Sequence, residues 1–387
     1  MKVYFDNAAT TKIHPRVAEK IISLLKDDFG NPSSIHSYGS KIKVMIEEAR
    51  ETVAEFINAD SSEIYFTSGG TESNNFIING ISKVNLLETN RNVIISNKAE
   101  HHAVIDSINE LQNYGFVPIF NDVNSDSTVS VASVKNLLNG NVSLISCMFV
   151  NNETGAINPI PELVKECKGE NLYIHTDAVQ AFGKFKIDVK EINIDAMSVS
   201  GHKIFAPKGI GAAYIRNGTP MKPLLFGGSQ ERNRRGGTEN IIGIAALAEA
   251  VKIAKEEMSD YYKHVKSLRD YFVNEIKLIA GETIEINSSE NQSPYILSIT
   301  FKNEYYNNDS EAMLIFLDLN GIAVSNGSAC SSGTLKPSHV ILAMGKKVED
   351  AKGTLRISFN PQNTKEEIDC TIDVIQKMIK KILRNSL

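Results

Sequence analysis

Hydrophobic and polar positions alternate along the first two thirds of the chain in a way that predicts crossover units. Segments with a helical period of apolar residues cover Arg16–Lys26, Ser40–Asn58 and Glu72–Lys83. Short apolar runs bounded by turn residues are typical of buried strands. Seven such runs are expected to be strands: Glu63–Thr67, Arg91–Ser96, Phe116–Phe120, Val142–Phe149, Leu172–Thr176, Ala196–Ser200 and Ala212–Ile215. This alternation predicts a doubly wound, mainly parallel α/β sheet.

The last third of the chain has a different pattern. A long helical stretch runs from Ile241 to about Ile279, and we expect it to link two domains and to break near Ser259-Asp260. From Thr283 onward the pattern reads strand, strand, helix, loop, strand and helix, ending in the amphipathic helix Glu366–Leu383. We therefore expect a large α/β domain over residues 15–260 and a smaller α+β domain formed by residues 1–14 and 261–387.

Composition narrows the classes of function. The chain has 387 residues, 42% of them hydrophobic, and a net charge of −5, which gives no basic face for a nucleic acid. The most basic stretch, Arg232 to Arg235, lies among glycines and suits a small anion better than a duplex. Without a charged leader followed by an apolar run, or eighteen apolar residues in succession, the sequence predicts a cytoplasmic protein with no membrane contact.

The 4 cysteines are far apart in the sequence, so neither a structural metal site nor a disulfide scaffold is expected. Cys330 stands out because small polar residues surround it from Val324 to Gly333, which predicts a reachable, partly ionised thiol on a loop at about 324–335. Cys147 lies in an apolar run and is expected in the core, whereas Cys167 and Cys370 fall in helices and need no function.

Two ionisable residues follow predicted strands. Lys203 ends the segment Ser198–Lys203, and burial there would lower the pKa of its amine and favour Schiff-base chemistry with an aldehyde cofactor. Asp177 stands at the carboxyl end of another strand, where it could pair with a protonated pyridine nitrogen. The alternatives are a solvated lysine and an aspartate that only caps the next helix.

Thr67–Glu72 runs from a strand through two glycines into a helix. Free N–H groups and hydroxyls at such a helix start suit a phosphate, although Gly70 and Thr71 could also merely cap the helix. The segment matches neither the P-loop pattern nor the dinucleotide-binding pattern. It therefore indicates an anion site of another type.

Three further side chains are candidates for substrate contacts. His101 and His102 are adjacent, so a regular backbone would let only one of them face a site, and a purely structural histidine is the alternative. Arg356 interrupts the apolar run Leu355–Phe359 and could bind a carboxylate through two hydrogen bonds. Its alternative is a charge on an edge strand that faces water.

Taken together, these segments resemble the class V branch of the fold-type I pyridoxal-phosphate enzymes, and specifically the cysteine desulfurases of the NifS and IscS type. The likeness covers almost the whole chain. The segments that carry it occur in the order Tyr4–Thr11, Phe29–Ser34, Thr67–Asn75, Val150–Gly155, His175–Gln180, Ser200–Lys203, Gly236–Thr238 and Ser325–Ser332.

The resemblance implies a role for each candidate in holding pyridoxal 5′-phosphate. Lys203 would form the Schiff base, Asp177 would bind the ring nitrogen, and Gln180 would donate to the ring oxygen. His101 would stack on the ring and assist proton transfer. The phosphate would be held by Gly70, Thr71, Ser200 and His202, with Thr238 contributed by the partner subunit of an obligate homodimer.

The resemblance also implies the substrate and the reaction. Arg356, helped by Asn31, would bind the carboxylate of L-cysteine, and Asn152 would touch cofactor and substrate. Cys330 would attack the sulfur of the substrate and keep it as a persulfide, while L-alanine leaves. The sulfur would then pass to an acceptor protein of iron–sulfur cluster assembly or tRNA thiolation. Housekeeping members carry a further C-terminal tail that helps dock the scaffold protein, and this sequence stops before it, so the resemblance leaves the acceptor open.

The sequence departs from the family pattern at two positions, Asn326, where a serine is usual, and Gly70, where an alanine is usual, and neither change removes a needed group. The main alternatives are an aminotransferase, which has no need of Cys330, and a selenocysteine lyase, which shares the same cofactor residues. A non-catalytic sulfur-transfer scaffold would have no need of Lys203, Asp177 or His101.

Overall fold

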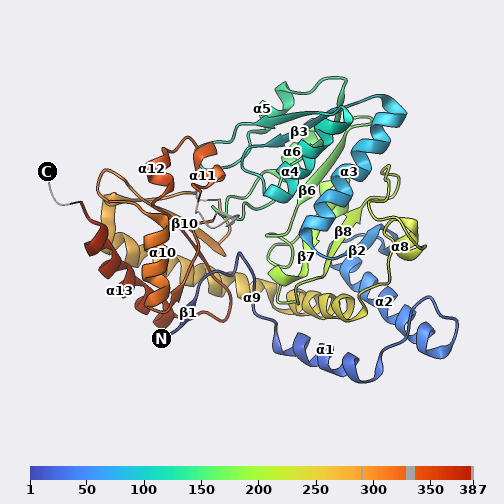
Figure 1. Ribbon diagram of the computed structural model, residues 1–387, viewed down its shortest axis with the longest axis horizontal. Coiled ribbons are helices and arrows are strands. Elements are labelled where there is room, and N and C mark those ends of the chain that lie inside the picture. The colour runs from blue at the N-terminus through green and yellow to red at the C-terminus, as the bar shows by residue number, and fades with distance from the viewer. Residues whose placement is uncertain (289–290, 328–335, 385–387) are drawn as a thin grey trace.

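The computed structural model describes residues 1–288, 291–327 and 336–384. Figure 1 shows two groups of elements, one around a large sheet and one around a small sheet, with a single long helix running beneath both. The N-terminus and the last described helix, Lys365–Ile382, lie in the group around the small sheet. None of the helices in the described part of the chain combines the length and the apolar character that a membrane crossing requires.

The large sheet has seven strands in the order β2-β8-β7-β6-β5-β3-β4. Only β8 runs antiparallel to its neighbours. The strands are β2 (Ile64–Thr67), β3 (Val93–Asn97), β4 (Val117–Asn121), β5 (Val142–Ser146), β6 (Tyr173–Asp177), β7 (Ala196–Ser200) and β8 (Gly211–Ile215). All seven predicted strands are therefore confirmed, as is the doubly wound α/β class.

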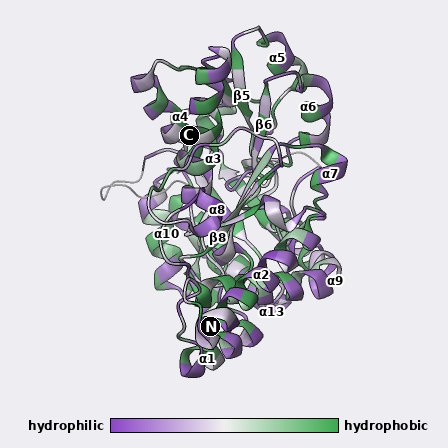
Figure 2. Ribbon diagram, turned by 90° about the vertical axis from the view of Figure 1, so that its right-hand side faces the viewer, coloured by the Kyte–Doolittle hydropathy of each residue, from purple (hydrophilic) through white to green (hydrophobic). Residues whose placement is uncertain are grey.

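Helices cover both faces of the large sheet. They are α1 (Pro15–Asp27), α2 (Ser37–Phe56), α3 (Gly70–Thr89), α4 (His102–Glu110), α5 (Val131–Asn136), α6 (Ile160–Cys167), α7 (Val189–Ile192), α8 (Gln230–Asn233) and α9 (Ile241–Ala280). Figure 2 shows helices that carry both hydrophilic and hydrophobic residues, as expected of elements that cover a sheet on one side and meet water on the other.

The alternation of side chains along each strand explains the two layers. On β3, Ile94 packs with α3 and α4 on one face, whereas its neighbour Ile95 packs with α2, α6 and α9 on the other. Leu144 and Ile145 divide in the same way on β5. Because successive side chains of a strand point to opposite faces, strands that are apolar throughout must be covered on both sides.

The small sheet belongs to a second core. Its three strands are antiparallel, in the order β12 (Thr354–Ser358), β10 (Ile296–Phe301) and β9 (Ile284–Ile286). Helices α10 (Ser310–Leu319), α11 (His339–Ala343), α12 (Val348–Ala351) and α13 (Lys365–Ile382) accompany it. A separate parallel pair joins β1 (Val3–Tyr4) to β11 (Ile322–Ala323).

One predicted feature is wrong. The long helix α9 does not break near Ser259-Asp260 but continues for 40 residues. Serine and aspartate cost little in a helix compared with glycine or proline, and neither of those residues occurs there. The helix joins both cores through Ala254 on the large-sheet side and Val265 on the small-sheet side. The predicted domain boundary near residue 260 falls inside this helix and stays a prediction.

The start of the chain crosses between the two groups. Phe5 packs in the small-sheet core, and its N–H donates to the carbonyl of Ala323 at 2.8 Å. Six residues later, the N–H of Thr11 donates to the carbonyl of His202 at 3.0 Å, directly after β7. The intervening residues therefore lie across the carboxyl end of the large sheet.

Candidate active site

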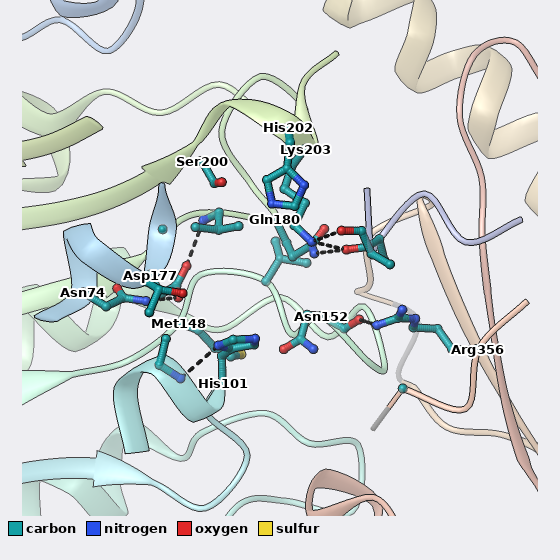
Figure 3. A pocket seen from close by; sticks show the side chains of 18 of the residues that line it. Asn74, His101, Met148, Asn152, Asp177, Gln180, Ser200, His202, Lys203 and Arg356 are labelled. Carbon is teal, nitrogen blue, oxygen red and sulfur yellow. Dashed lines mark hydrogen bonds between the residues drawn. The ribbon is translucent and has the colours of Figure 1, made fainter. Parts of the chain in front are cut away.

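A pocket of about 370 Å³ opens at the carboxyl end of the large sheet, where the crossing N-terminal segment, the loop after β5 and strand β12 meet. This volume is within the range of small-molecule sites. It brings together ten of the predicted site residues: Gly70, Thr71, His101, Asn152, Asp177, Gln180, Ser200, His202, Lys203 and Arg356. Figure 3 shows Lys203 and His202 on one side of the pocket, His101 on the opposite side and Arg356 beyond Asn152.

Lys203 lies in a short turn directly after β7. Its ammonium donates to the carbonyl of Ala8 at 2.6 Å and to the carbonyl of Ala9 at 2.7 Å. Burial lowers the pKa of Lys203 to about 8, and the nearby Arg356 cation acts in the same direction. Near physiological pH the amine is therefore neutral more often than that of an ordinary lysine, which favours a nucleophilic or basic role.

Asp177 is the last residue of β6 and is almost completely buried. The side-chain amide of Asn74 donates to Asp177 Oδ2 at 2.7 Å, and the N–H of Val179 donates to Oδ1 at 2.9 Å. Two donors fix the orientation of the carboxylate on the pocket wall, where it can accept from a protonated ring nitrogen.

The segment predicted to bind an anion forms a strand–turn–helix junction at the pocket. β2 ends at Thr67 and α3 begins at Gly70, so the first N–H groups of a 20-residue helix face the pocket. A side chain on Gly70 would bring its Cβ within 2.7 Å of Val179 Cγ2 and 3.5 Å of Ser200 Cβ, so the backbone approaches its neighbours closely there. The free N–H groups and the Ser200 hydroxyl make a site for an anion.

The two histidines at the pocket are neutral near pH 7. His101 caps α4, and its Nδ1 accepts from the N–H of Ala103 at 3.0 Å, which places the proton of the neutral ring on Nε2. Burial lowers the pKa of His101, and the Lys203 cation adds to this effect. Burial and Lys203 also lower the pKa of His202, to about 4.

Arg356 is buried, so the alternative of a strand charge facing water is wrong. Its Nη1 donates to the carbonyl of Asn152 at 2.9 Å, and its Nη2 donates to Asp6 Oδ1 at 2.8 Å. Arg356 Nε and Asn152 Oδ1 are buried and find no partner among the described residues. Such unsatisfied polar atoms in a pocket wall suit a ligand that carries a carboxylate and an amine.

Two predicted site residues, Thr238 and Asn31, do not line this pocket. Thr238 lines a neighbouring cavity behind the strand–turn–helix junction, together with Ser68 and Arg235. Asn31 precedes α2, where its Oδ1 accepts from the N–H of Ser33 at 2.9 Å. Cys330 lies outside the described residues. The roles predicted for these three residues stay predictions.

The described residues contain no group of three or more histidine, cysteine or acidic side chains that could hold a metal ion. Of the other cysteines, Cys147 and Cys167 are buried, and burial raises the pKa of both thiols. The sequence did not reveal the contributions of Ala8 and Ala9, which act through their backbone carbonyls, or those of Asp6 and Asn74. The last two lie inside segments already noted, and only the fold reveals their partners.

Known proteins resemble this chain in sequence and in fold over almost its whole length. Residues 3–370 match the model of the family described as aminotransferase class-V. The chain is 43% identical over 381 residues to "Cysteine desulfurase IscS" of Dictyoglomus turgidum. The matched region covers 98% of this chain and 95% of the relative. A solved structure titled "NIFS-LIKE PROTEIN" superposes with a TM-score of 0.89 at 34% identity, covering 99% of this chain and 100% of the other. Another, "SspA in complex with cysteine", has a TM-score of 0.82 at 32% identity and covers 94% of this chain and 100% of the other.

Proposed function

Because the chain belongs to the aminotransferase class-V family, we propose that its pocket binds pyridoxal 5′-phosphate and that the protein acts as a cysteine desulfurase. As a desulfurase it converts L-cysteine into L-alanine and retains the sulfur. The observation that carries this proposal is the convergence of an enclosed lysine, Lys203, a buried carboxylate, Asp177, and a buried guanidinium, Arg356, on one pocket.

The donors and acceptors of the pocket fit the cofactor group by group. The start of α3, with Gly70 and Thr71, and the hydroxyl of Ser200 suit the phosphate. Asp177 suits the ring nitrogen, and the Gln180 amide suits the ring oxygen. Four chemically different protein groups thus suit three different groups of one molecule.

Further contacts complete the proposed cofactor site. His101 would face the ring and His202 would lie beside the phosphate. In a homodimer, Thr238 of the partner subunit would complete the phosphate site. Thr238 is exposed in the single chain, which leaves it available for such a contact.

When bound, the cofactor supplies an aldehyde that condenses with amines and a ring that draws electrons from the bonds next to the attached nitrogen. Lys203 can then remove the α-proton of the substrate as a base, because its lowered pKa of about 8 leaves a substantial neutral fraction near neutral pH. His101, with its proton on Nε2, is placed to hand a proton to the substrate side of the pocket.

Arg356 and Asn152 bind and orient the amino acid. The guanidinium already contacts Asp6 and the Asn152 carbonyl, which holds it in one rotamer, and its Nε is left for the incoming carboxylate. Asn152 offers an unsatisfied side-chain oxygen at the same place. Asn31 is the further residue that we propose for carboxylate binding.

We assign the sulfur-accepting step to Cys330. Its thiolate attacks the sulfur of the substrate, a sulfur–sulfur bond forms, and the carbon–sulfur bond breaks with its electron pair staying on carbon. A proton then completes the methyl group of alanine. The persulfide on Cys330 can pass its outer sulfur to an acceptor protein, for which iron–sulfur cluster assembly and tRNA thiolation are the two proposed destinations.

The proposal is tested with purified protein, pyridoxal 5′-phosphate, L-cysteine and a reductant. We expect a visible absorbance band on adding the cofactor, and alanine and sulfide in equal amounts. A coloured protein that makes neither product would point to an aminotransferase, and a protein that takes up no cofactor would refute the cofactor assignment.

Two variants separate the proposed roles. Cys330→Ala should keep the visible band but release no sulfide from cysteine, with Cys370→Ala as the matched control that keeps both. Lys203→Ala should lose the band itself. Normal sulfide release by Cys330→Ala would contradict the persulfide mechanism, and an unchanged band in Lys203→Ala would show that another lysine binds the cofactor.

A further inference from the structure

A second enclosed lysine, Lys184, lies beside the pocket, and the proposed mechanism does not use it. Its Nζ donates to Gln180 Oε1 at 3.1 Å and lies 5.4 Å from the centre of the Tyr295 ring. A small cavity of about 20 Å³ lies between Lys184, Lys203 and Tyr295. Lys203 lines both this cavity and the pocket, whereas Lys184 lines only the cavity.

The surroundings of Lys184 are unusual for a structural lysine. The residue is half-buried and its ammonium is enclosed by protein, and no carboxylate of the described chain forms an ion pair with it. The charged neighbours that affect it are cations, Lys203 and Arg356, and together with burial they lower the pKa of Lys184 to about 7. An enclosed cation without an anionic partner costs stability, so a purely structural role explains it poorly.

The contact with Gln180 determines which way its carboxamide points. An ammonium can only donate, so the atom that faces Lys184 must be the oxygen. The nitrogen at the other end donates to the carbonyl of Ala8 at 2.9 Å, and a carbonyl can only accept. Lys184 and Ala8 therefore select the same orientation, with the donor of Gln180 toward the pocket.

We propose that Lys184 is a positioning residue that acts through Gln180, keeping the carboxamide nitrogen toward the pocket so that the ring oxygen of the cofactor meets a donor. This inference rests on the proposed cofactor site. Without Lys184, the side chain could turn its oxygen toward the pocket, where two acceptors would face each other. The cofactor would then bind more weakly, although every residue that touches it is still present.

The test measures cofactor affinity rather than turnover. Apoprotein is titrated with pyridoxal 5′-phosphate, and the visible absorbance gives the dissociation constant for the wild type, Lys184→Met, Lys184→Arg and Lys186→Met. Loss of one well-oriented hydrogen bond should weaken binding about fivefold in Lys184→Met. Lys184→Arg keeps a cationic donor and should restore binding to within about twofold of the wild type. Lys186 is exposed and two residues away, so Lys186→Met is the matched control and should bind like the wild type.

A double variant shows whether the effect passes through Gln180. In a Gln180→Leu background, the further change Lys184→Met should leave the dissociation constant unchanged. Additive losses, or wild-type affinity in Lys184→Met, would overturn the inference. If Lys184→Met does not fold, as judged by its melting temperature, Lys184→Leu, which also lacks a donor, replaces it with the same expected direction. A wild-type protein that develops no visible band would instead contradict the proposed function itself.

Discussion

Substitutions of Arg356 can separate two effects of its guanidinium. One is binding of the substrate carboxylate, and the other is the lowering of the Lys203 pKa by its charge. Its geometry leaves Nε for the substrate carboxylate, while Nη1 and Nη2 are already bound to Asn152 and Asp6. Its charge lowers the pKa of Lys203. Arg356→Lys keeps the charge and loses the planar geometry, whereas Arg356→Met loses both.

The size of the geometric effect follows from the bonds at stake. A hydrogen bond to a charged group contributes about 1.5–3 kcal/mol, which corresponds to about a 10- to 150-fold loss in kcat/KM for L-cysteine in both variants. Because the carboxylate is bound before and during the reaction, most of this loss should appear as a higher KM.

The electrostatic effect has a definite sign. With the cation removed in Arg356→Met, the pKa of Lys203 rises above about 8, so a smaller fraction of the amine is neutral at any given pH. The acid limb of the kcat profile should therefore move to higher pH in Arg356→Met and stay in place in Arg356→Lys.

The assay is alanine formation at a series of pH values and cysteine concentrations. Arg356→Met also leaves the carboxylate of Asp6, which is 24% exposed, without its partner. The double variant with Asp6→Asn serves as the folding control. An unchanged KM in both variants would refute carboxylate binding by Arg356. An equal shift of the pH profile in both variants would refute the electrostatic argument.

Three further predictions concern residues around the pocket. Burial raises the pKa of Glu100 to about 8, so the stability linked to its proton is complete below pH about 4.5 and is lost as the pH rises through about 8. Glu100→Gln should therefore flatten the fall in melting temperature between pH 6 and 9. An unchanged pH dependence in this variant would refute the assignment to Glu100. In Gly211→Ala, the new Cβ would lie 2.5 Å from the carbonyl oxygen of Val199 and 2.7 Å from Gly69 Cα. We expect this overlap to lower the free energy of unfolding, measured by denaturant titration, by at least about 2 kcal/mol. A loss under about 0.5 kcal/mol would contradict this prediction. Cys147→Ala should keep desulfurase activity within about twofold, because this buried thiol takes no part in the chemistry; a large loss with unchanged stability would show otherwise.

The pattern of the chain predicted the large sheet well because its strands are short, apolar and buried on both faces. Val93–Asn97 and Ala196–Ser200 are examples in which every residue is buried. The same reasoning failed on α9, where Ser259 and Asp260 were expected to interrupt the helix. Propensity alone did not show that the helix is held at both ends by two different cores.

The candidate site was predictable where its residues stand at strand ends. Lys203 follows β7 and Asp177 is the last residue of β6, and the carboxyl ends of parallel strands meet at one edge of a sheet. The ion pair of Arg356 with Asp6 could not be predicted in this way, because it joins residues 350 positions apart. The same holds for the contact of Lys203 with the Ala8 carbonyl, which depends on the path of the backbone rather than on side-chain chemistry.

The crossing N-terminal segment also has a consequence for the order of events during synthesis. Val3 pairs with Ile322, and Asp6 reaches β12, so the first residues to leave the ribosome find their partners only after more than 300 others have followed. Until then, the segment of Ala8 and Ala9 has only its contacts with the large-sheet side, such as that of Thr11 with His202, and its partners in the small-sheet group are missing. The nascent chain can complete its large sheet early, but the part of the pocket wall that β12 contributes through Arg356 is added only near the end of translation.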